Sequence, residues 1–175
     1  MTFSEPRLEL ARRLLAACEA RGWRLATAES CTGGLIVACL TEIPGSSSVV
    51  ERGYVTYDNR AKQELLGVPA GTIERVGAVS EEVARAMAEG ALERSGVGLA
   101  IACTGIAGPG GATPKKPVGL VHLAVARRGG PTLHAREVFS GDRSAIRSAS
   151  VDAALELAIR SFARSLRISR SATRR

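Results

Sequence analysis

Three short segments of the chain hold more glycine and small polar residues than a simple connection between elements requires. They are residues 29–34, 44–48 and 104–111. Glycine lets backbone N–H groups approach an anion closely, and a helix N-terminus adds a favourable dipole. Because the run Cys31-Thr32-Gly33-Gly34 opens an apolar helix, it is a candidate cradle for a phosphate or an oxyanion. The alternative is that Ser30 or Thr32 only caps this helix.

The scarcity of histidine limits the bases that a serine nucleophile could use. The chain has only His122 and His134, and neither lies in a glycine-rich turn, so a Ser-His-Asp mechanism is disfavoured. A lysine can replace histidine if burial or nearby positive charge lowers its pKa. Lys62 is the only lysine before Lys115 in a chain that otherwise uses arginine, which cannot release its proton. This pattern indicates serine–lysine chemistry, and the alternative is that Lys62 is one more exposed helix lysine.

The nucleophile is not fixed by the residues alone, because several serines lie in suitable turns: Ser30, Ser46, Ser47 and Ser48. The segment 104–111 follows an apolar run, where open α/β sheets place ligands. It fits neither common phosphate motif, because no Gly-Lys-Ser/Thr follows it and Thr113 stands where Gly-x-Gly-x-x-Gly needs its last glycine. ATP and dinucleotides are therefore not indicated.

No metal site is expected. The two histidines are twelve residues apart and fit neither HExxH nor a zinc-finger spacing. The cysteines never form Cys-x-x-Cys and lie in apolar or glycine-flanked segments, which favours buried, reduced thiols. They are Cys18, Cys31, Cys39 and Cys103.

Composition indicates one soluble globular domain of 175 residues, with 45% hydrophobic and 23% charged residues. No apolar run approaches the roughly 20 residues that span a bilayer, and residues 1–6 lack the pattern of a signal peptide, so a cytoplasmic location is expected. The net charge of +7 suggests nucleic acid. However, seven of the 24 basic residues lie at or after Arg147, and aromatic residues make up only 3%. Nucleic-acid binding is therefore disfavoured against a solvated helix face and tail.

The periodicity predicts a single three-layer α/β/α domain with a mixed β-sheet over residues 1–168, followed by a basic, disordered tail at 169–175. Turn and cap signals give the element order α-β-α-β-α-α-β-β-β-α. The expected helices are 6–21, 35–40, 59–67, 80–94 and 142–166, and the expected strands are 23–28, 53–57, 97–102, 119–126 and 132–139.

Seven blocks of residues, in order from about Leu8 to Leu166, resemble the CinA C-terminal domain family. The blocks are Ala28-Glu29-Ser30-Cys31-Thr32-Gly33-Gly34, Ile43-Pro44-Gly45-Ser46-Ser47, Val55-Thr56-Tyr57-Asp58-Asn59-Arg60-Ala61-Lys62, Gly77-Ala78-Val79-Ser80, Thr104-Gly105-Ile106-Ala107-Gly108-Pro109, Lys116-Pro117-Val118-Gly119 and Phe139-Ser140-Gly141-Asp142-Arg143. One block departs from the family pattern, because Gly110-Gly111-Ala112 follows Gly108-Pro109 and changes the length or shape of that loop.

The resemblance implies a nicotinamide-nucleotide amidohydrolase, which converts nicotinamide mononucleotide and water to nicotinate mononucleotide and ammonia without a metal or organic cofactor. It implies that Ser47 is the nucleophile, that Lys62 is its base and that Tyr57 assists in proton transfer or orientation. The residues implied to bind the substrate are Ser30, Thr32, Gly33, Thr104, Gly105, Arg143 and Arg147. Of these, Arg143 or Arg147 is expected to hold the phosphate.

The resemblance also implies a homo-oligomer, because CinA-like domains commonly self-associate. It leaves a rival reading open, in which the chain is a non-catalytic nucleotide-binding regulatory module linked to competence or recombination. Binding of nicotinamide mononucleotide without release of ammonia distinguishes this rival from the enzyme.

Overall fold

The computed structural model describes residues 3–163, so the predicted tail at 169–175 lies outside the described residues. The helices are α1 Glu5–Glu19, α2 Leu35–Thr41, α3 Asn59–Leu66, α4 Ala70–Val76, α5 Glu81–Ser95 and α6 Arg143–Ala163, with a short 3-10 turn, η1, at Ser46–Ser48. The strands are β1 Leu25–Glu29, β2 Val50–Val55, β3 Leu99–Gly105, β4 Leu120–Arg127 and β5 Leu133–Val138. The order agrees with the predicted one except for α4, because no helix is predicted for these seven residues.

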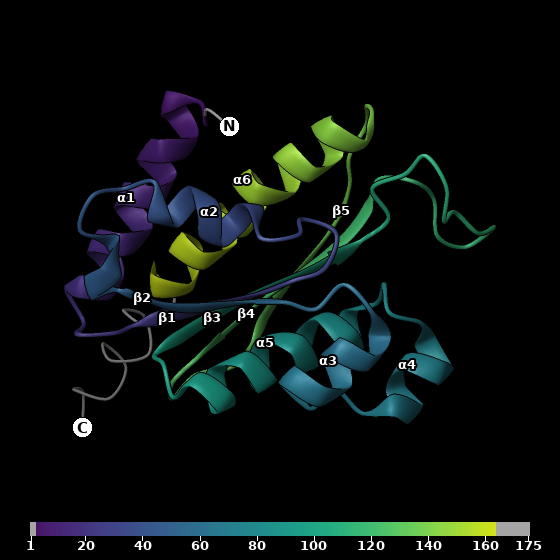
Figure 1. Ribbon diagram of the computed structural model, residues 1–175, viewed down its shortest axis with the longest axis horizontal. Helices are drawn as coiled ribbons and strands as arrows, with labels where there is room; N and C mark the ends of the chain where they lie inside the picture. Colours follow the sequence, from purple (N-terminus) through teal and green to yellow (C-terminus); the bar gives the residue numbers. More distant parts are fainter. Residues whose placement is uncertain (1–2, 164–175) are drawn as a thin grey trace, which may run out of the picture.

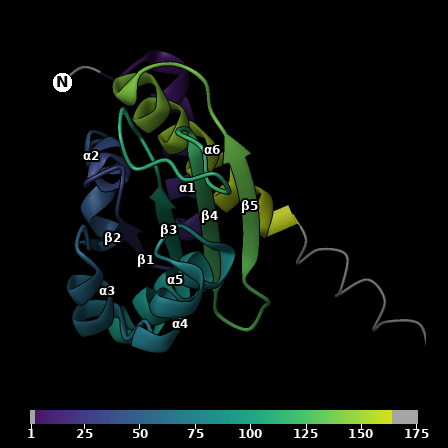
Figure 2. The same cartoon turned by 90° about the vertical axis from the view of Figure 1, so that its right-hand side faces the viewer.

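Within the described residues the strands form one sheet in the order β2-β1-β3-β4-β5. Strands β1, β2 and β3 are parallel, whereas β4 pairs antiparallel with β3 and β5 antiparallel with β4. The mixed sheet predicted from the sequence is therefore confirmed. Strands β2 and β5 are its two edges, and they lie on opposite sides of the molecule (Figure 2).

Helices cover both faces of the sheet, which makes the three layers (Figure 1). Helices α1, α2 and α6 pack on one face around leucine, valine and cysteine side chains, and α3, α4 and α5 pack on the other around an alanine-rich core. Close packing on the second face requires a small residue, because a Cβ on Gly90 of α5 would lie 1.8 Å from the carbonyl oxygen of Leu66. No helix among the described residues is long and apolar enough to cross a membrane.

The parallel strands bring distant segments to one end of the sheet, where these strands finish. We call this end the carboxyl edge, to distinguish it from the edge strands β2 and β5. The carboxyl ends of β1, β2 and β3 point the same way, so the residues that follow them, Ser30, Thr56 and the loop after Gly105, gather at that edge. The start of α3 lies there too, because this helix follows the end of β2. Asp58 caps the helix by accepting a hydrogen bond of 2.8 Å from the N–H of Arg60. The opposite edge carries η1 and the start of β2 (Figure 1).

Candidate active site

Lys62 is buried at the carboxyl edge of the sheet, with only 1% of the residue exposed. Its amine donates hydrogen bonds to the carbonyl oxygens of Thr56 at 2.8 Å, Tyr57 at 3.1 Å and Asp58 at 3.5 Å. Loss of hydration on burial lowers the pKa of Lys62. Lys62 is therefore a buried amine, and the alternative of an exposed helix lysine is wrong.

The three carbonyl contacts match the three N–H donors of an ammonium, so they favour the charged form of Lys62 and act against the effect of burial. A neutral amine keeps two N–H donors and gains a lone pair. The contacts to Thr56 and Tyr57 satisfy two donors, while the 3.5 Å contact to Asp58 is at the limit of a hydrogen bond. Deprotonation of the amine therefore removes only the longest of the three contacts.

Ser30 follows the end of β1, and Thr104 lies next to the end of the neighbouring strand β3, both on the same side as Lys62. The N–H of Ser30 binds the carbonyl of Cys103 at 2.9 Å, and the N–H of Thr56 binds the carbonyl of Glu29 at 2.8 Å. These bonds tie the end of β1 to the carbonyl that holds Lys62. The hydroxyl of Thr104 donates to the carbonyl of Ala78 at 2.9 Å, which fixes the loop before α5 at this edge.

A second group of predicted residues adjoins the first. The guanidinium of Arg143, at the start of α6, donates to the hydroxyl of Tyr57 at 3.1 Å and to the carbonyl of Gly108 at 2.9 Å. Tyr57 is 61% exposed, and Arg143 is exposed too. The tyrosine, the arginine and the loop after Gly105 therefore line one accessible side of the edge.

The turn 31–34 does not form the open anion cradle that its sequence suggests. The carboxylate of Glu29 is fully buried and accepts hydrogen bonds from the N–H groups of Gly34, Ile36 and Val37 at 2.9–3.0 Å. The N–H groups of Gly33 and Leu35 bind carbonyls within the turn. The interpretation of these amides as a phosphate site is corrected, because the chain's own carboxylate already occupies the helix N-terminus.

Thr32 and Arg147 belong to the support of this turn. Thr32 is fully buried, and its carbonyl accepts a hydrogen bond of 2.9 Å from Arg147, which also binds the carbonyl of Cys31 at 3.1 Å. A Cβ on Gly33 would lie 3.5 Å from the same guanidinium. Arg147 thus fixes the backbone of the turn, which leaves Arg143 as the more exposed of the two arginines.

Ser47 lies at the end of the sheet opposite the carboxyl edge that holds Lys62. It is an exposed residue of η1, before the start of β2, whereas Lys62 lies beyond its end. A six-residue strand is roughly 20 Å long. One copy of the chain therefore does not bring the predicted pair together, and the candidate serine on the side of Lys62 is Ser30, which is 9% exposed.

Sequence reasoning missed several polar groups around this edge. Besides Glu29, the thiols of Cys31 and Cys103 lie 3.6 Å apart, and their hydrogen bond and burial raise the pKa of Cys103 well above its usual value. On β4, His122 is the register partner of Thr104, and its Nδ1 lies 3.0 Å from Nε2 of His134. The only signal for Glu29 was a carboxylate at the end of an otherwise apolar strand.

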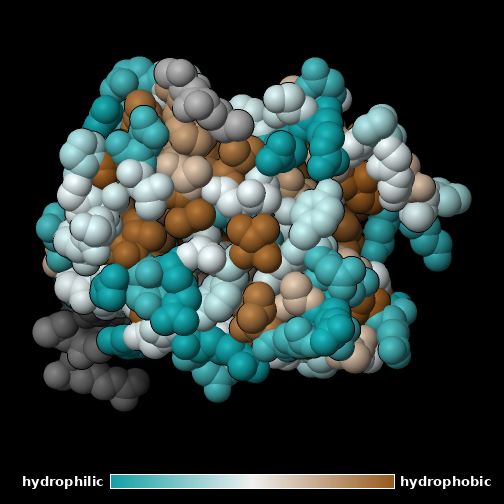
Figure 3. Space-filling view, in the orientation of Figure 1, coloured by the Kyte–Doolittle hydropathy of each residue, from teal (hydrophilic) through white to brown (hydrophobic). Residues whose placement is uncertain are grey.

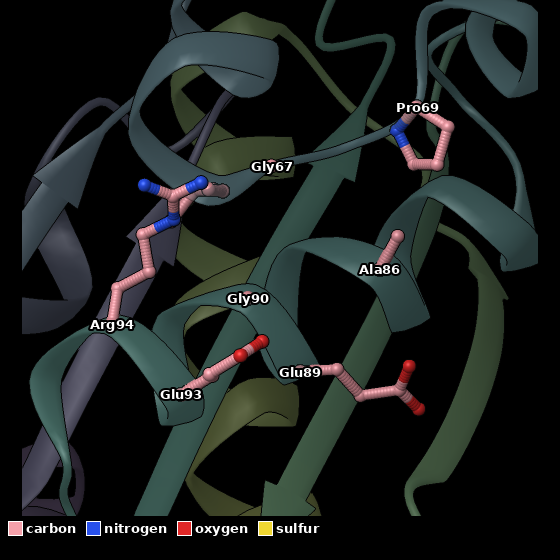
Figure 4. Close-up of a pocket in the computed structure, with 8 residues that line it drawn as sticks. Gly67, Pro69, Ala86, Glu89, Gly90, Glu93 and Arg94 are labelled. Carbon is pink, nitrogen blue, oxygen red and sulfur yellow. The ribbon is translucent and has the colours of Figure 1, made fainter.

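One hollow on the surface lies away from this site. It has a volume of about 680 Å³ and lies between the end of α3 and the exposed side of α5 (Figure 4). Its lining residues are Leu66, Gly67, Pro69, Ala86, Glu89, Gly90, Glu93 and Arg94. The lining has no serine, cysteine or lysine, so this hollow does not supply the predicted serine–lysine chemistry.

The family model for the CinA C-terminal domain matches residues 7–162. The chain is 49% identical over 160 residues to the nicotinamide-nucleotide amidohydrolase PncC of Enterobacter agglomerans, covering 91% of this chain and 98% of that protein. It is 60% identical over 124 residues to a CinA-like protein of Akkermansia muciniphila, covering 71% of this chain. The chain spans only 30% of the length of that Akkermansia relative.

Solved structures share the fold. The competence/damage inducible protein CihA of Agrobacterium tumefaciens superposes with a TM-score of 0.88 at 51% identity, covering 91% of this chain and 97% of that one. A CinA superfamily protein of Klebsiella pneumoniae superposes with a TM-score of 0.86 at 37% identity, covering 90% of this chain and 98% of that one.

Proposed function

The chain belongs to the CinA C-terminal domain family, and from this membership we propose that it is a nicotinamide-nucleotide amidohydrolase. The reaction is hydrolysis of the carboxamide of nicotinamide mononucleotide to the carboxylate, with release of ammonia. The similarity to PncC over 91% of this chain supports this substrate. The structure adds one observation that carries the proposal, which is the buried amine of Lys62 with its lowered pKa. A serine nucleophile that has no histidine beside it can use such an amine as its base.

The proposed mechanism has two stages, formation of an ester on the serine and hydrolysis of that ester. A serine Oγ attacks the carboxamide carbon while its proton passes to the neutral amine of Lys62, which gives a tetrahedral oxyanion. The C–N bond then breaks, the proton moves from Lys62 to the leaving nitrogen, and ammonia departs, which leaves an ester between the serine and nicotinate mononucleotide. Water, deprotonated by Lys62, hydrolyses this ester and restores the serine hydroxyl.

The serine remains to be assigned. Ser47 is the nucleophile that the family resemblance implies, and it requires an arrangement that one copy of the chain does not supply. Ser30 is the alternative within one copy, because it follows β1 beside the carbonyl network of Lys62. With either serine, Thr104 and Gly105 border the site from β3, and Ser30 contacts the substrate even where it is not the nucleophile.

Arg143 is the proposed partner of the substrate phosphate. A guanidinium binds phosphate oxygens through several N–H groups at once. Arg143 is exposed, and its contacts with Tyr57 and Gly108 hold it at the mouth of the site. Tyr57 then orients Arg143 through its hydroxyl, and it can also orient the carboxamide of the substrate.

The proposal is tested by following ammonia release from nicotinamide mononucleotide, nicotinamide riboside and free nicotinamide. We expect turnover of the mononucleotide, with a kcat/KM for the riboside at least tenfold lower because the phosphate contact is lost. Equal kcat/KM values would remove Arg143 from phosphate binding. Binding of the mononucleotide by calorimetry without any ammonia release would instead support the regulatory module. An amidohydrolase of this substrate acts where the nucleotide is made and used, so we also propose a cytoplasmic location.

A further inference from the structure

A small hollow adjoins the turn that follows Ser30, between helices α1, α2 and α6. These three helices pack on the same face of the sheet (Figure 1). The hollow has a volume of about 220 Å³, which is room for about seven water molecules, because one molecule occupies roughly 30 Å³ of liquid water. Neither Lys62 nor Arg143 lines it, so it is separate from the groups proposed to act on the amide and to hold the phosphate.

The polar side chains that line the hollow can all donate hydrogen bonds. Two are guanidinium groups and two are hydroxyls, and they belong to Arg7, Ser144, Arg147 and Ser148. No carboxylate or amide side chain is among the lining residues. A ligand that accepts from several such donors at once is an anion, because hydrogen bonds from charged donors to an anion are the strongest that these groups form.

The two arginines differ in how their charge is balanced. Arg7 is paired with Asp152 through Nε at 2.6 Å and Nη2 at 2.8 Å, so this pair has no net charge. Arg147 is half-buried, and its Nε and Nη2 donate to the uncharged carbonyl groups of Cys31 and Thr32. No carboxylate of residues 3–163 forms an ion pair with Arg147. The hollow therefore has one unbalanced positive charge, which a bound monoanion would neutralise.

Several of these donors are still available. Nη1 of Arg7 and Nη1 of Arg147 form no hydrogen bond with residues 3–163. The hydroxyl of Ser148 accepts a hydrogen bond of 2.6 Å from Nη2 of Arg7, which leaves its own hydrogen to donate. Ser144 is exposed, and its hydroxyl has no hydrogen-bond partner within the same range of residues. All four side chains can thus donate to one ligand in the hollow.

The rest of the lining is apolar. Phe3 and Val151 are buried, and Leu35 at the start of α2 is half-buried. Hydrophobic and strongly hydrophilic side chains lie next to one another on the surface over α2 and α6 (Figure 3). Sites for small molecules typically combine apolar walls with a few polar groups that fix the orientation of the ligand. A ligand with an anionic end and an apolar body would use both parts of this lining.

We propose that this hollow binds a small carboxylate with an apolar body, such as an aromatic acid, at a site separate from the one around Lys62. The carboxylate accepts hydrogen bonds from Nη1 of Arg147 and from the hydroxyls of Ser144 and Ser148, and the ring packs against the apolar wall. A monoanion is favoured over a phosphate dianion, because only one positive charge in the hollow is unbalanced.

Binding in the hollow acts on the turn beside the active site. Arg147 holds the carbonyls of Cys31 and Thr32, and a carboxylate on its remaining N–H groups fixes the guanidinium in this position. The bound acid therefore stabilises the turn that begins at Ser30. This inference does not depend on the proposed amidohydrolase function, because it concerns binding and thermal stability.

The test compares benzoate with benzamide, which has the same ring and no charge. Thermal unfolding of the wild type is followed with each compound, and calorimetry counts the sites. At about 10 mM, benzoate should raise Tm by about 3 °C or more, the shift expected for a Kd of about 1 mM, and it should bind once per chain. Benzamide should leave Tm unchanged. Acetate, which lacks the ring, should need a concentration at least about tenfold higher for the same shift.

Three variants locate the bound benzoate. Ser144→Asp places a carboxylate at the hollow itself, so it should abolish the shift in Tm that benzoate causes. Ala145→Asp is the matched control, because it adds the same charge to the same exposed turn of α6 and Ala145 does not line the hollow. Arg143→Ala should respond to benzoate as the wild type does, since Arg143 is not a lining residue either.

Each other result overturns the proposal. An absent shift with benzoate, or an equal shift with benzamide or acetate, removes the proposed class of ligand. A shift that survives in Ser144→Asp and disappears in Arg143→Ala places benzoate in the active site. Equal losses in Ser144→Asp and Ala145→Asp show a general effect of charge on α6. Ammonia release is measured separately, so none of these results bears on the amidohydrolase function.

Discussion

The amine of Lys62 lies 2.8 Å from the carbonyl oxygen of Thr56, and the N–H of Thr56 binds the carbonyl oxygen of Glu29 at 2.8 Å. Two consecutive hydrogen bonds therefore connect the amine of Lys62 to the end of β1, where Ser30 begins the turn. Any change that moves this turn also moves the surroundings of the amine.

Activity should rise with pH through one ionisation. Burial lowers the pKa of Lys62, so the fraction of neutral amine grows as pH rises through that lowered value. The profile of kcat/KM against pH for nicotinamide mononucleotide measures this.

Lys62→Arg keeps the positive charge but cannot accept a proton, so it should lose on the order of 10² or more in kcat. Lys115→Arg is the control, and near-wild-type activity in Lys62→Arg would falsify the lysine base.

If Ser47 is the nucleophile that the family resemblance implies, Ser47→Ala should be at least as damaging as Lys62→Arg, because it removes the atom that forms the ester. The double variant should be little worse than the more damaged single variant, since the two residues act as a unit. Ser48→Ala controls for disturbance of η1. Kinetics on folded variants decide between serines: if Ser47→Ala retains activity and Ser30→Ala loses it, Ser30 is the nucleophile.

Arg143→Ala should raise KM for nicotinamide mononucleotide about tenfold or more, because a charge-assisted contact with phosphate contributes on the order of 1.5–3 kcal/mol. The weaker turnover of nicotinamide riboside should hardly change, since the riboside has no phosphate. Arg13→Ala, on the exposed side of α1, is the matched control. An equal effect on both substrates would show that Arg143 acts on the shape of the loop and not on the anion.

Glu29→Gln should destabilise the fold. The carboxylate accepts hydrogen bonds from three backbone N–H groups and from the hydroxyl of Thr27, and an amide can accept at only one of its two positions. We expect a loss of about 1–3 kcal/mol in the free energy of unfolding, measured by urea denaturation. The exposed Glu42→Gln, at the other end of α2, should change it by less than about 0.5 kcal/mol.

Acid should destabilise the protein through His122. Burial lowers the pKa of His122 to about 4, with His134, Arg136 and Lys116 acting in the same direction and Glu81 against it. The neutral ring is thus favoured in the folded state, so its contribution is complete above about pH 6.5, the unfolded value, and is lost as pH falls towards 4.

The free energy of unfolding, measured by urea denaturation at steps between pH 7 and 4, checks this. His122→Gln should flatten the dependence in that window, and its lower stability at pH 7 is separated from the slope by the same series. An unchanged slope would assign the acid sensitivity to other groups.

The amino-acid sequence by itself determined the layered α/β fold and the segments that carry chemistry. Alternating apolar runs and cap residues are local signals, so helices such as 81–95, with Ser80 as its cap and Gly96 at its end, follow from short-range physics. The short helix α4 escaped because seven residues after a proline give little periodicity. The lone Lys62 among arginines made it the predicted base before any contact was known.

Tertiary structure alone decided what those segments do together. It buried Lys62 against three carbonyls, filled the predicted anion cradle with Glu29 and turned Arg147 towards the turn while Arg143 remained at the surface. It also placed Ser47 and Lys62 at opposite ends of β2. Sequence spacing cannot give these relations, because distance in space depends on strand order and direction. Those are set by the packing of the whole sheet, to which every strand contributes.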